Sequence, residues 1–191
     1  MSEPSRQDEA QLIAGCVRGD RNAQRMLYER YASVMYPVCV RYVGSEDAKD
    51  MLQDGFLMVF DKIGTYKGEG SFEGWMRKVF VNTCLMQLRK TDILKQAVQI
   101  DGESSKAEAT LELDPEETAQ MDADKLMEMI VSMPDGFRTV FNLYAIEGFS
   151  HKEISKMLNL SEGGCRSQLS RARAWLQERI SKLNSSNEKA K

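Results

Sequence analysis

Several residue types and motifs are scarce in this 191-residue sequence, and each absence argues against a class of protein. His151 is the single histidine, which argues against a His-based catalytic triad or a multi-histidine metal centre. The four cysteines form no CxxC pair, so we expect neither a structural zinc site nor a disulfide framework, and such sparse use is typical of a reducing cytosol. No apolar run approaches the roughly 18 residues of a membrane span, and the polar N-terminus does not resemble a signal peptide.

The motifs of several enzyme classes are also missing. GxGxxG, GxxxxGK[ST], GxSxG and HExxH do not occur in the chain. Carboxylates are plentiful, but their spacing marks neither an acid–base pair nor a metal cluster. We therefore expect a protein that is not an enzyme and that has no metal and no cofactor.

Charge is present in quantity but is unevenly distributed. The chain has 26 Lys and Arg against 29 Asp and Glu, a net charge of −3. Residues 91–122 contain nine acidic and two basic residues and no aromatic ones, as in a solvated, flexible linker. Residues 150–191 contain nine basic and four acidic residues. We therefore predict an N-terminal domain at 1–91, an acidic linker at 92–121, a basic domain at 122–183 and a disordered tail at 184–191.

The spacing of apolar residues predicts an all-α fold with two small helical domains. No segment alternates with period two, and apolar residues recur at intervals of three and four. A first helix is expected from about Asn22 to Val43, kinked at Pro37 and ended by Gly44. Ser71 is expected to cap a later helix that runs to about Lys90. The stripe of the first helix is Ala23, Leu27, Val34 and Val38, and the next helix has the stripe Ala48, Met51, Leu52, Gly55, Phe56, Val59, Phe60 and Ile63.

Two exposed stripes in the N-terminal domain differ in their chemistry. Asp47, Asp50 and Asp54 share one helical face, which is either an ordinary solvated surface or a docking surface for a basic partner. In the later helix, cationic and amide side chains share a face beside aromatic residues. Cations can follow a nucleic-acid backbone and aromatic rings can stack on its bases, so this face suits single-stranded nucleic acid. Its residues are Tyr66, Trp75, Lys78, Asn82 and Arg89.

The basic domain contains a helix-turn-helix pattern. Ser150 and Glu153 form a capping box that begins a short helix, and Ser161 can cap a second helix after a short turn. An apolar stripe of the second helix faces inward, and basic and hydroxyl side chains lie on its outer side. Arg can bind guanine in the major groove, so the pattern favours DNA binding over a helical hairpin with a solvated face. The outer side carries Arg166, Ser170 and Arg173, with Ser167, Gln168 and Arg171 next to it.

Both halves resemble a known family. The segments DAKDMLQDGFLMVFDKI and GSFEGWMRKVFVNTCLMQLRK resemble region 2 of a bacterial sigma factor. GFSHKEISKMLNLSEGGCRSQLSRARAWL resembles region 4. Two such regions joined by an acidic linker are similar to the extracytoplasmic-function (ECF) group of the sigma-70 family. In the usual Gly-Thr-Val position of that group the chain has Gly163-Gly164-Cys165, so the start of the second helix departs from the family pattern.

The resemblance implies partners and contact residues. It implies that one face of region 2 binds the β′ clamp coiled coil of core RNA polymerase, through Asp47, Asp50, Gln53 and Asp54. It implies that the following segment reads and opens the −10 promoter element, and that the 65–71 loop helps to hold a flipped base. The expected −10 contacts are Tyr66, Lys67, Trp75, Arg77, Lys78, Asn82 and Arg89. Region 4 would bind the β flap and the −35 element, the latter through Ser161, Arg166, Ser167, Gln168, Ser170, Arg171 and Arg173.

The function expected from these features is that of an ECF sigma factor, which brings core RNA polymerase to promoter DNA. The resemblance adds an anti-sigma factor as a partner, often membrane-bound in relatives. We expect a cytoplasmic chain that is a monomer when free and does not insert into a membrane. The main alternative is a free-standing helix-turn-helix regulator with an N-terminal sensing or dimerising domain. A nuclease on a helical scaffold is a third possibility, and it would require a metal-binding carboxylate cluster.

Overall fold

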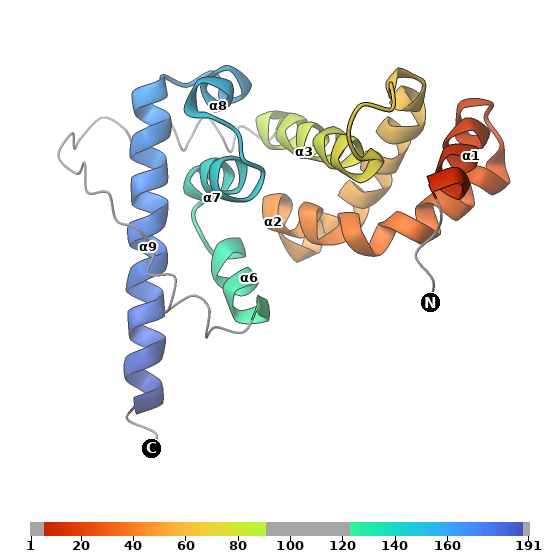
Figure 1. The fold of residues 1–191 in the computed structure, drawn as a ribbon. Coiled ribbons are helices and arrows are strands. Elements are labelled where there is room, and N and C mark those ends of the chain that lie inside the picture. The colour runs from red at the N-terminus through yellow and green to blue at the C-terminus, as the bar shows by residue number, and fades with distance from the viewer. Residues whose placement is uncertain (1–5, 91–122, 189–191) are drawn as a thin grey trace. The chain divides into compact units, whose positions relative to one another are not determined.

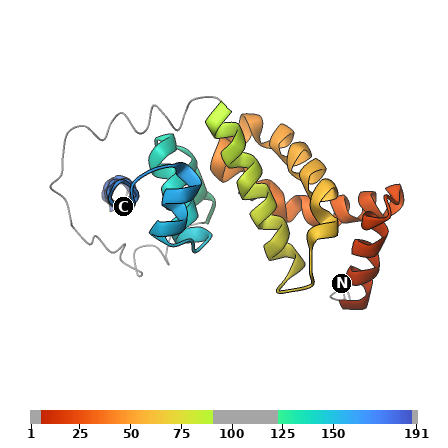
Figure 2. The same cartoon turned by 90° about the horizontal axis from the view of Figure 1, so that it is seen from above.

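The computed structural model describes residues 6–90 and 123–188, whose regular elements are all helices (Figures 1 and 2). The chain divides into two compact units, and the boundary between them in the sequence falls after Gln87. The prediction of an all-α fold in two domains is confirmed, with no strand among the described residues. The predicted linker at 92–121 lies outside the described residues. The predicted tail is helical as far as Glu188, and its last three residues are also outside the described part.

The N-terminal unit consists of three helices and a short 3-10 turn (Figure 1). These are α1 (Arg6–Val17), α2 (Arg21–Lys62), η1 (Ile63–Thr65) and α3 (Phe72–Lys90). The Asp20 carboxylate caps α2 by accepting hydrogen bonds from the backbone N–H groups of Asn22 and Ala23. These bonds satisfy donors that a helix start leaves unpaired. Ser71 caps α3 in the predicted manner, because its hydroxyl accepts a bond from the Gly74 N–H.

A single residue breaks α2. Gly44 has φ of 82° and ψ of 171°, outside the helical region, and this positive φ is one that glycine adopts without steric cost. The prediction of a helix end at Gly44 is therefore confirmed as a break, after which the helix resumes. The predicted kink at Pro37 is not seen in the backbone angles, which stay helical there. The predicted stripe also needs a correction at Val34, which is exposed, while Tyr31 and Met35 take the buried positions.

The second half of α2 packs closely on α3. The predicted stripe after Gly44 is buried, except for Phe60, which is half-buried. Phe56 and Phe80 meet edge to face with ring centroids 5.3 Å apart. Gly55 lies directly against Phe80, and a Cβ atom added at this glycine would be 2.1 Å from Phe80 Cε1. The glycine is therefore required by the close approach of the two helices.

We expect Gly55→Ala to destabilise the N-terminal unit by roughly 1–3 kcal/mol, because the added methyl group must displace a buried ring. Gly64→Ala is the matched control, since a Cβ atom at Gly64 meets nothing within 4 Å. Urea unfolding of the full chain, followed by the fluorescence of Trp75 in a Trp175→Phe background, gives the free energy of unfolding. Equal stability of the two alanine variants would contradict this account of the interface.

The C-terminal unit also consists of short helices, with one long helix at its end (Figure 1). Its elements are α6 (Ala123–Val131), α7 (Asp135–Phe141), the π-helical turn η3 (Asn142–Ile146), α8 (His151–Leu158) and α9 (Glu162–Glu188). The inward residues of α8 and α9 form one core, and Cys165 within it is completely buried. This burial supports the interpretation of Cys165 as a small core residue.

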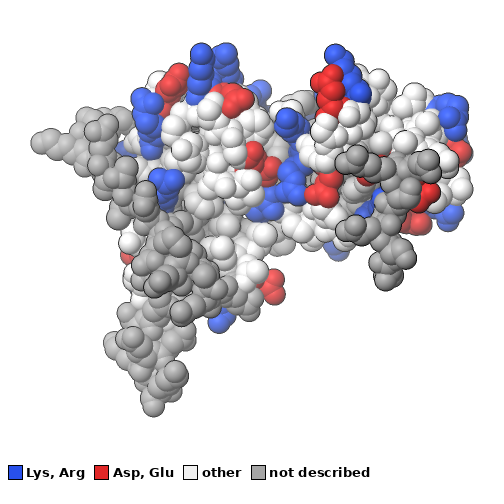
Figure 3. Space-filling view, in the orientation of Figure 1, with Lys and Arg blue, Asp and Glu red and all other residues white. Residues whose placement is uncertain are grey.

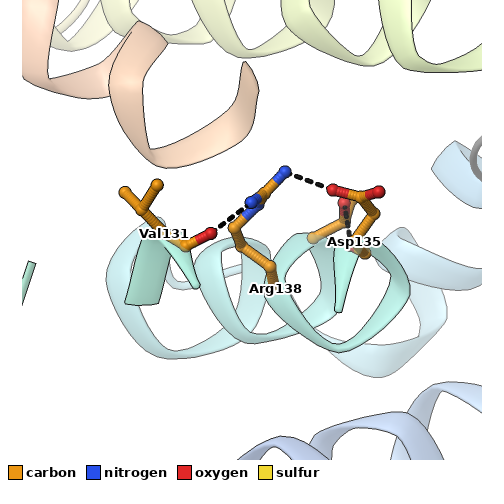
Figure 4. Close-up of polar contacts among 4 residues, drawn as sticks. Val131, Asp135 and Arg138 are labelled. Atoms are coloured by element: carbon orange, nitrogen blue, oxygen red, sulfur yellow. Dashed lines mark hydrogen bonds and ion pairs between the residues drawn. The ribbon is translucent and has the colours of Figure 1, made fainter. Parts of the chain in front are cut away.

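Arg138 ties α6 to α7 (Figure 4). Its guanidinium donates a 2.5 Å hydrogen bond to the Val131 carbonyl at the end of α6 and forms an ion pair with Asp135 in the first turn of α7. Burial lowers the pKa of Arg138, and the neighbouring Asp135 carboxylate opposes this shift. A buried cation is tolerated when it is paired and hydrogen-bonded in this way. The contact fixes the connection between the two helices.

Candidate nucleic-acid and protein interfaces

The acidic face predicted on α2 is formed as expected. Asp47, Asp50, Gln53 and Asp54 are all exposed, while Ala48, Met51 and Leu52 on the opposite side are buried. The helical repeat of about 3.6 residues therefore places the apolar residues on a core face and the polar residues on an exposed face. We call the exposed residues Asp47, Asp50, Gln53, Asp54 and Leu57 the acidic face.

Leu57 was not predicted as part of this face. Its side chain is 66% exposed, more than that of any other large apolar residue in the described parts of the chain. It follows Gln53 by four residues and Asp54 by three, so it shares their side of α2. The spacing from Gln53 and Asp54 could have indicated that Leu57 is exposed. It was missed because its neighbours in the sequence are apolar residues of the longer buried stripe. An exposed apolar side chain in this place could add an apolar contact if the face binds a protein.

A second polar surface lies on α3. Lys78, Asn82 and Arg89 are exposed at spacings of four and seven residues, which places them on one side of the helix. Met86 lies between Asn82 and Arg89 and is 46% exposed, and it was also missed in the sequence. Arg77 is half-buried and forms a 3.1 Å ion pair with Glu73, so it is held back along the helix. We call Lys78, Asn82, Met86 and Arg89 the α3 face.

The loop before α3 is held by a cluster of aromatic rings. Tyr66 and Trp75 are both half-buried, and their ring centroids are 5.7 Å apart. Phe72 is buried between them, stacked on Trp75 at 5.5 Å and in edge contact with Tyr66 at 5.1 Å. The Tyr66 hydroxyl donates a 2.8 Å hydrogen bond to the Gly70 carbonyl. Tyr66 and Trp75 therefore shape the loop and each keeps part of its ring exposed, while Lys67 is exposed beside them.

The helix-turn-helix predicted in the C-terminal unit is present as α8 and α9. Ser150 and Glu153 form the predicted capping box, with Ser150 N–H donating to the Glu153 carboxylate at 2.8 Å. Asn159 takes a left-handed conformation with φ of 55° in the turn, which Asn tolerates better than most residues. Ser161 caps α9 by accepting a 2.9 Å bond from the Gly164 N–H, so the unusual glycine pair still begins a helix.

The outer side of α9 carries most of the residues predicted there. Ser161 and Arg166 are exposed, and Ser167, Ser170, Arg171 and Arg173 are half-buried. Figure 3 shows Lys and Arg side chains gathered over α8 and the start of α9, at one end of the unit, with some acidic side chains between them. We call these six α9 residues the α9 face.

Gln168 is the exception. Its side chain is only 2% exposed, so it is not available as a contact and is removed from the predicted set. It lies three residues after Cys165 and four before Ala172, both of which are completely buried. Its position thus belongs to the inward stripe of α9, although its amide suggested an outer role.

His151 lies at the junction of three elements in this unit. Its ring stacks on that of Tyr144 from η3, with centroids 4.5 Å apart and an interplanar angle of 18°. The Arg173 guanidinium from α9 lies 5.9 Å from the centre of the Tyr144 ring. Burial lowers the pKa of His151, and Arg166 and Arg173 lower it further, while Glu162 opposes them. The imidazole is therefore neutral at pH 7.

The lowered pKa predicts a pH dependence of stability. Well above a pH of about 6.5 His151 is neutral in both the folded and the unfolded state, so its ionisation costs the C-terminal unit no stability. As the pH falls below this value the unfolded chain takes up the proton first, and stability is lost down through the lower pKa of the folded state. We expect His151→Phe to remove this part of the acid destabilisation. Melting curves between pH 7.5 and 5, followed by Trp175 fluorescence in a Trp75→Phe background, compare the two proteins, and identical pH dependence would contradict the assignment.

These surfaces define a class of protein. One unit has a helix-turn-helix with a basic outer side, and the other has a second face of cations and an amide beside aromatic rings, together with an acidic face that DNA would repel. No helix in the described parts of the chain is long and apolar enough to cross a membrane. Within residues 6–90 and 123–188, no group of three or more His, Cys, Asp or Glu side chains could hold a metal ion. The class is a DNA-binding protein that also binds another protein.

Comparisons with known proteins identify the family. Family models for sigma-70 region 2 and sigma-70 region 4 match residues 27–93 and 123–176. The ECF RNA polymerase sigma-E factor of Haemophilus influenzae is 26% identical over 183 residues, covering 90% of this chain and 95% of the relative. The ECF RNA polymerase sigma factor SigM of Mycobacterium tuberculosis is 28% identical over 183 residues, covering 92% and 86%.

Two solved structures are also similar to the chain. The sigma factor RpoE in complex with the anti-sigma factor NepR, from Bartonella quintana, is 18% identical with a TM-score of 0.49, and covers 83% of this chain and 96% of its own. CnrH in complex with the cytosolic domain of CnrY is 20% identical with a TM-score of 0.43, covering 92% and 96%.

The chain belongs to the sigma-70 family, in its ECF group. As a sigma factor it binds core RNA polymerase and promoter DNA, directs the polymerase in transcription initiation and is not an enzyme. The family expected from the sequence is thereby confirmed, and the free-standing regulator and the nuclease are set aside. The comparisons do not test the individual contact residues, which remain predictions.

Proposed function

We propose that this sigma factor docks on the β′ clamp coiled coil of core RNA polymerase through the acidic face. Its carboxylates would pair with basic side chains, and Leu57 would supply an apolar contact at the centre of the docking surface. The observation that carries the proposal is that one small unit has two exposed surfaces of opposite charge, the acidic face and the α3 face. The α3 face suits nucleic acid, whereas the acidic face repels it, so the latter is best used by a protein.

The α3 face and the 65–71 loop read and open the −10 element. Lys78 and Arg89 follow the phosphate backbone, and the Asn82 amide binds the edge of an unstacked base. Tyr66 and Trp75 offer partly exposed rings, and the Tyr66–Gly70 hydrogen bond gives the loop a fixed shape before DNA arrives. Holding a base outside the stack stabilises the melted strand, so opening needs no ATP. Lys67, within the loop, is a further phosphate contact, and Arg77 on α3 is another.

The α9 face reads the −35 element in the major groove. Arg166, Arg171 and Arg173 can bind guanine edges. The hydroxyl groups of Ser161, Ser167 and Ser170 can reach phosphates or bases. The same unit touches the β flap, which holds it at the upstream element. We place the protein in the cytoplasm, as a monomer when free, and propose an anti-sigma factor as the partner that covers its polymerase-binding surfaces.

We expect the isolated chain to bind promoter duplex weakly at physiological salt. Neutralisation of phosphates supplies most non-specific affinity for DNA, and the chain has a net charge of −3. The basic faces therefore act when the polymerase already holds the DNA. Fluorescence anisotropy of a labelled promoter duplex compares the chain alone with its complex with core polymerase. Tight, sequence-selective binding by the chain alone would contradict the expectation and would favour a free-standing regulator.

Transcription in vitro tests the proposed function as a whole. Core RNA polymerase is incubated with a pool of promoter fragments from the host, with and without the chain, and the transcript ends are mapped. New, discrete start sites that require the chain would support the proposal and would reveal both promoter elements. The absence of both new start sites and binding to core polymerase would overturn it.

A further inference from the structure

The strongest candidate outside the expected contacts is the stack of Tyr144, His151 and Arg173. The three side chains come from three different elements, η3, α8 and α9. Tyr144 contacts both of the others, with His151 stacked on it at 4.5 Å and the Arg173 guanidinium 5.9 Å from its ring centre. Neither Tyr144 nor His151 was among the expected contact residues. Tyr144 contacts Arg173 of the α9 face directly, and His151 contacts Tyr144.

The stack has the chemistry needed to hold an arginine in place. A guanidinium is attracted to the face of an aromatic ring, and this attraction is sensitive to the position of the ring. The Tyr144 ring is itself oriented by the nearly parallel imidazole of His151. A neutral imidazole can stack in this way without repelling Arg173, and burial, together with the neighbouring Arg166 and Arg173, lowers the pKa of His151 and so favours its neutral form.

We propose that Tyr144 and His151 are positioning residues for −35 recognition, and that their stack holds the Arg173 guanidinium in the orientation in which it meets DNA. The inference depends on the proposed role of the α9 face. An arginine that is already ordered loses less conformational freedom when it binds, so the stack raises affinity without touching DNA. Specificity for the −35 element thus extends into η3 and the first residue of α8.

A different role for the stack is purely structural, with the rings only packing η3 against α8. That role and the positioning role make different predictions about Arg173. If Tyr144 acts through Arg173, the loss of Tyr144 has no further effect once Arg173 is gone. If Tyr144 only stabilises the unit, the two losses add, as they do for independent sites.

The experiment is a double-mutant cycle in the complex of the full chain with core polymerase. Affinity is measured for a promoter fragment found by the transcription assay and for the same fragment with a scrambled −35 element. We expect Tyr144→Leu to weaken binding by roughly three- to tenfold on the intact fragment only, and Tyr144→Phe, which keeps the ring, to remain within about twofold of wild type. In an Arg173→Ala background, Tyr144→Leu should cause no further loss.

Additive losses from Tyr144→Leu and Arg173→Ala, or an equal loss on the scrambled fragment, would overturn the inference. An Arg173→Ala variant with full −35 affinity would instead remove Arg173 from the proposed −35 contacts, and the inference would fail with it. If Tyr144→Leu prevents folding of the unit, the same cycle is made with His151→Ala, with His151→Phe as the variant expected to restore affinity. An unchanged affinity for His151→Ala would then count against the positioning role.

Discussion

Replacing Asp50 with Arg is expected to lower the affinity of the chain for core RNA polymerase by roughly 30- to 300-fold, because like charges opposed in an interface cost several kcal/mol. Asp50 is exposed near the middle of the acidic face, so the change does not disturb the core. The promoter-independent affinity is measured with labelled chain and core enzyme at two salt concentrations. The loss should be larger at low salt, where the Coulomb interaction is less screened.

Glu29→Arg is the matched control for this prediction. Glu29 is also exposed on α2 but lies before Gly44, in the other half of the broken helix. Both variants change the net charge by the same amount, so only the position of the change differs. Equal losses for the two would show that overall charge, and not the acidic face, determines binding. Leu57→Ala should weaken binding at all salt concentrations, since its contribution is apolar.

The second large effect is expected from Asn82→Ala, which should reduce transcription from a promoter with an intact −10 element by roughly 10- to 100-fold, the worth of a specific contact with a base edge. Binding to core polymerase should be unchanged, because Asn82 lies on the α3 face and not on the acidic face. The measurement is the rate of open-complex formation on the intact promoter and on promoters substituted at each −10 position. At the position that Asn82 reads, the variant should lose its preference among the four bases.

Gln87→Ala removes the same kind of amide from the same helix and serves as the control. Gln87 is exposed and follows Asn82 by five residues, so it projects from a different side of α3. An equal defect in the two variants would indicate a general weakening of α3. A defect in Asn82→Ala that is uniform over all −10 substitutions would indicate a backbone contact without base readout.

The helices and most of their buried faces could be predicted because burial in a helix repeats every three to four residues. The stripe from Ala48 to Ile63 and the capping box at Ser150 are local patterns of this kind. Val34 was assigned to the core, but Tyr31 and Met35 occupy the buried positions. The residue types did not decide between them, since tyrosine and methionine occur on both the buried and the exposed side of a helix. The break in α2 was predicted in two places, and only Gly44, with its positive φ, leaves the helical conformation.

Two kinds of feature in the site were not predicted. One kind is a residue whose polarity does not match its burial, and the other is a contact between segments that are distant in the sequence. Gln168 is polar but occupies an inward position, and Leu57 is apolar but occupies an outward one. The Tyr144–His151–Arg173 stack joins elements whose proximity no spacing in the sequence records. The aromatic cluster of Tyr66, Phe72 and Trp75 was only half visible, because the rings are close in sequence but their mutual packing is tertiary.

The burial of Gln168 has a consequence for how promoter preference can be changed in this protein. The positions of α9 that we propose to face DNA and those that face the core alternate along the same few turns, and Gln168 belongs to the core side. A randomised library at Arg166, Ser167, Ser170 and Arg171 can explore new target sequences while the fold is kept. Randomising Gln168 would instead produce mainly misfolded variants, because its side chain is buried. Any mutation that changes promoter preference without loss of the fold has the same restricted set of positions on which to act.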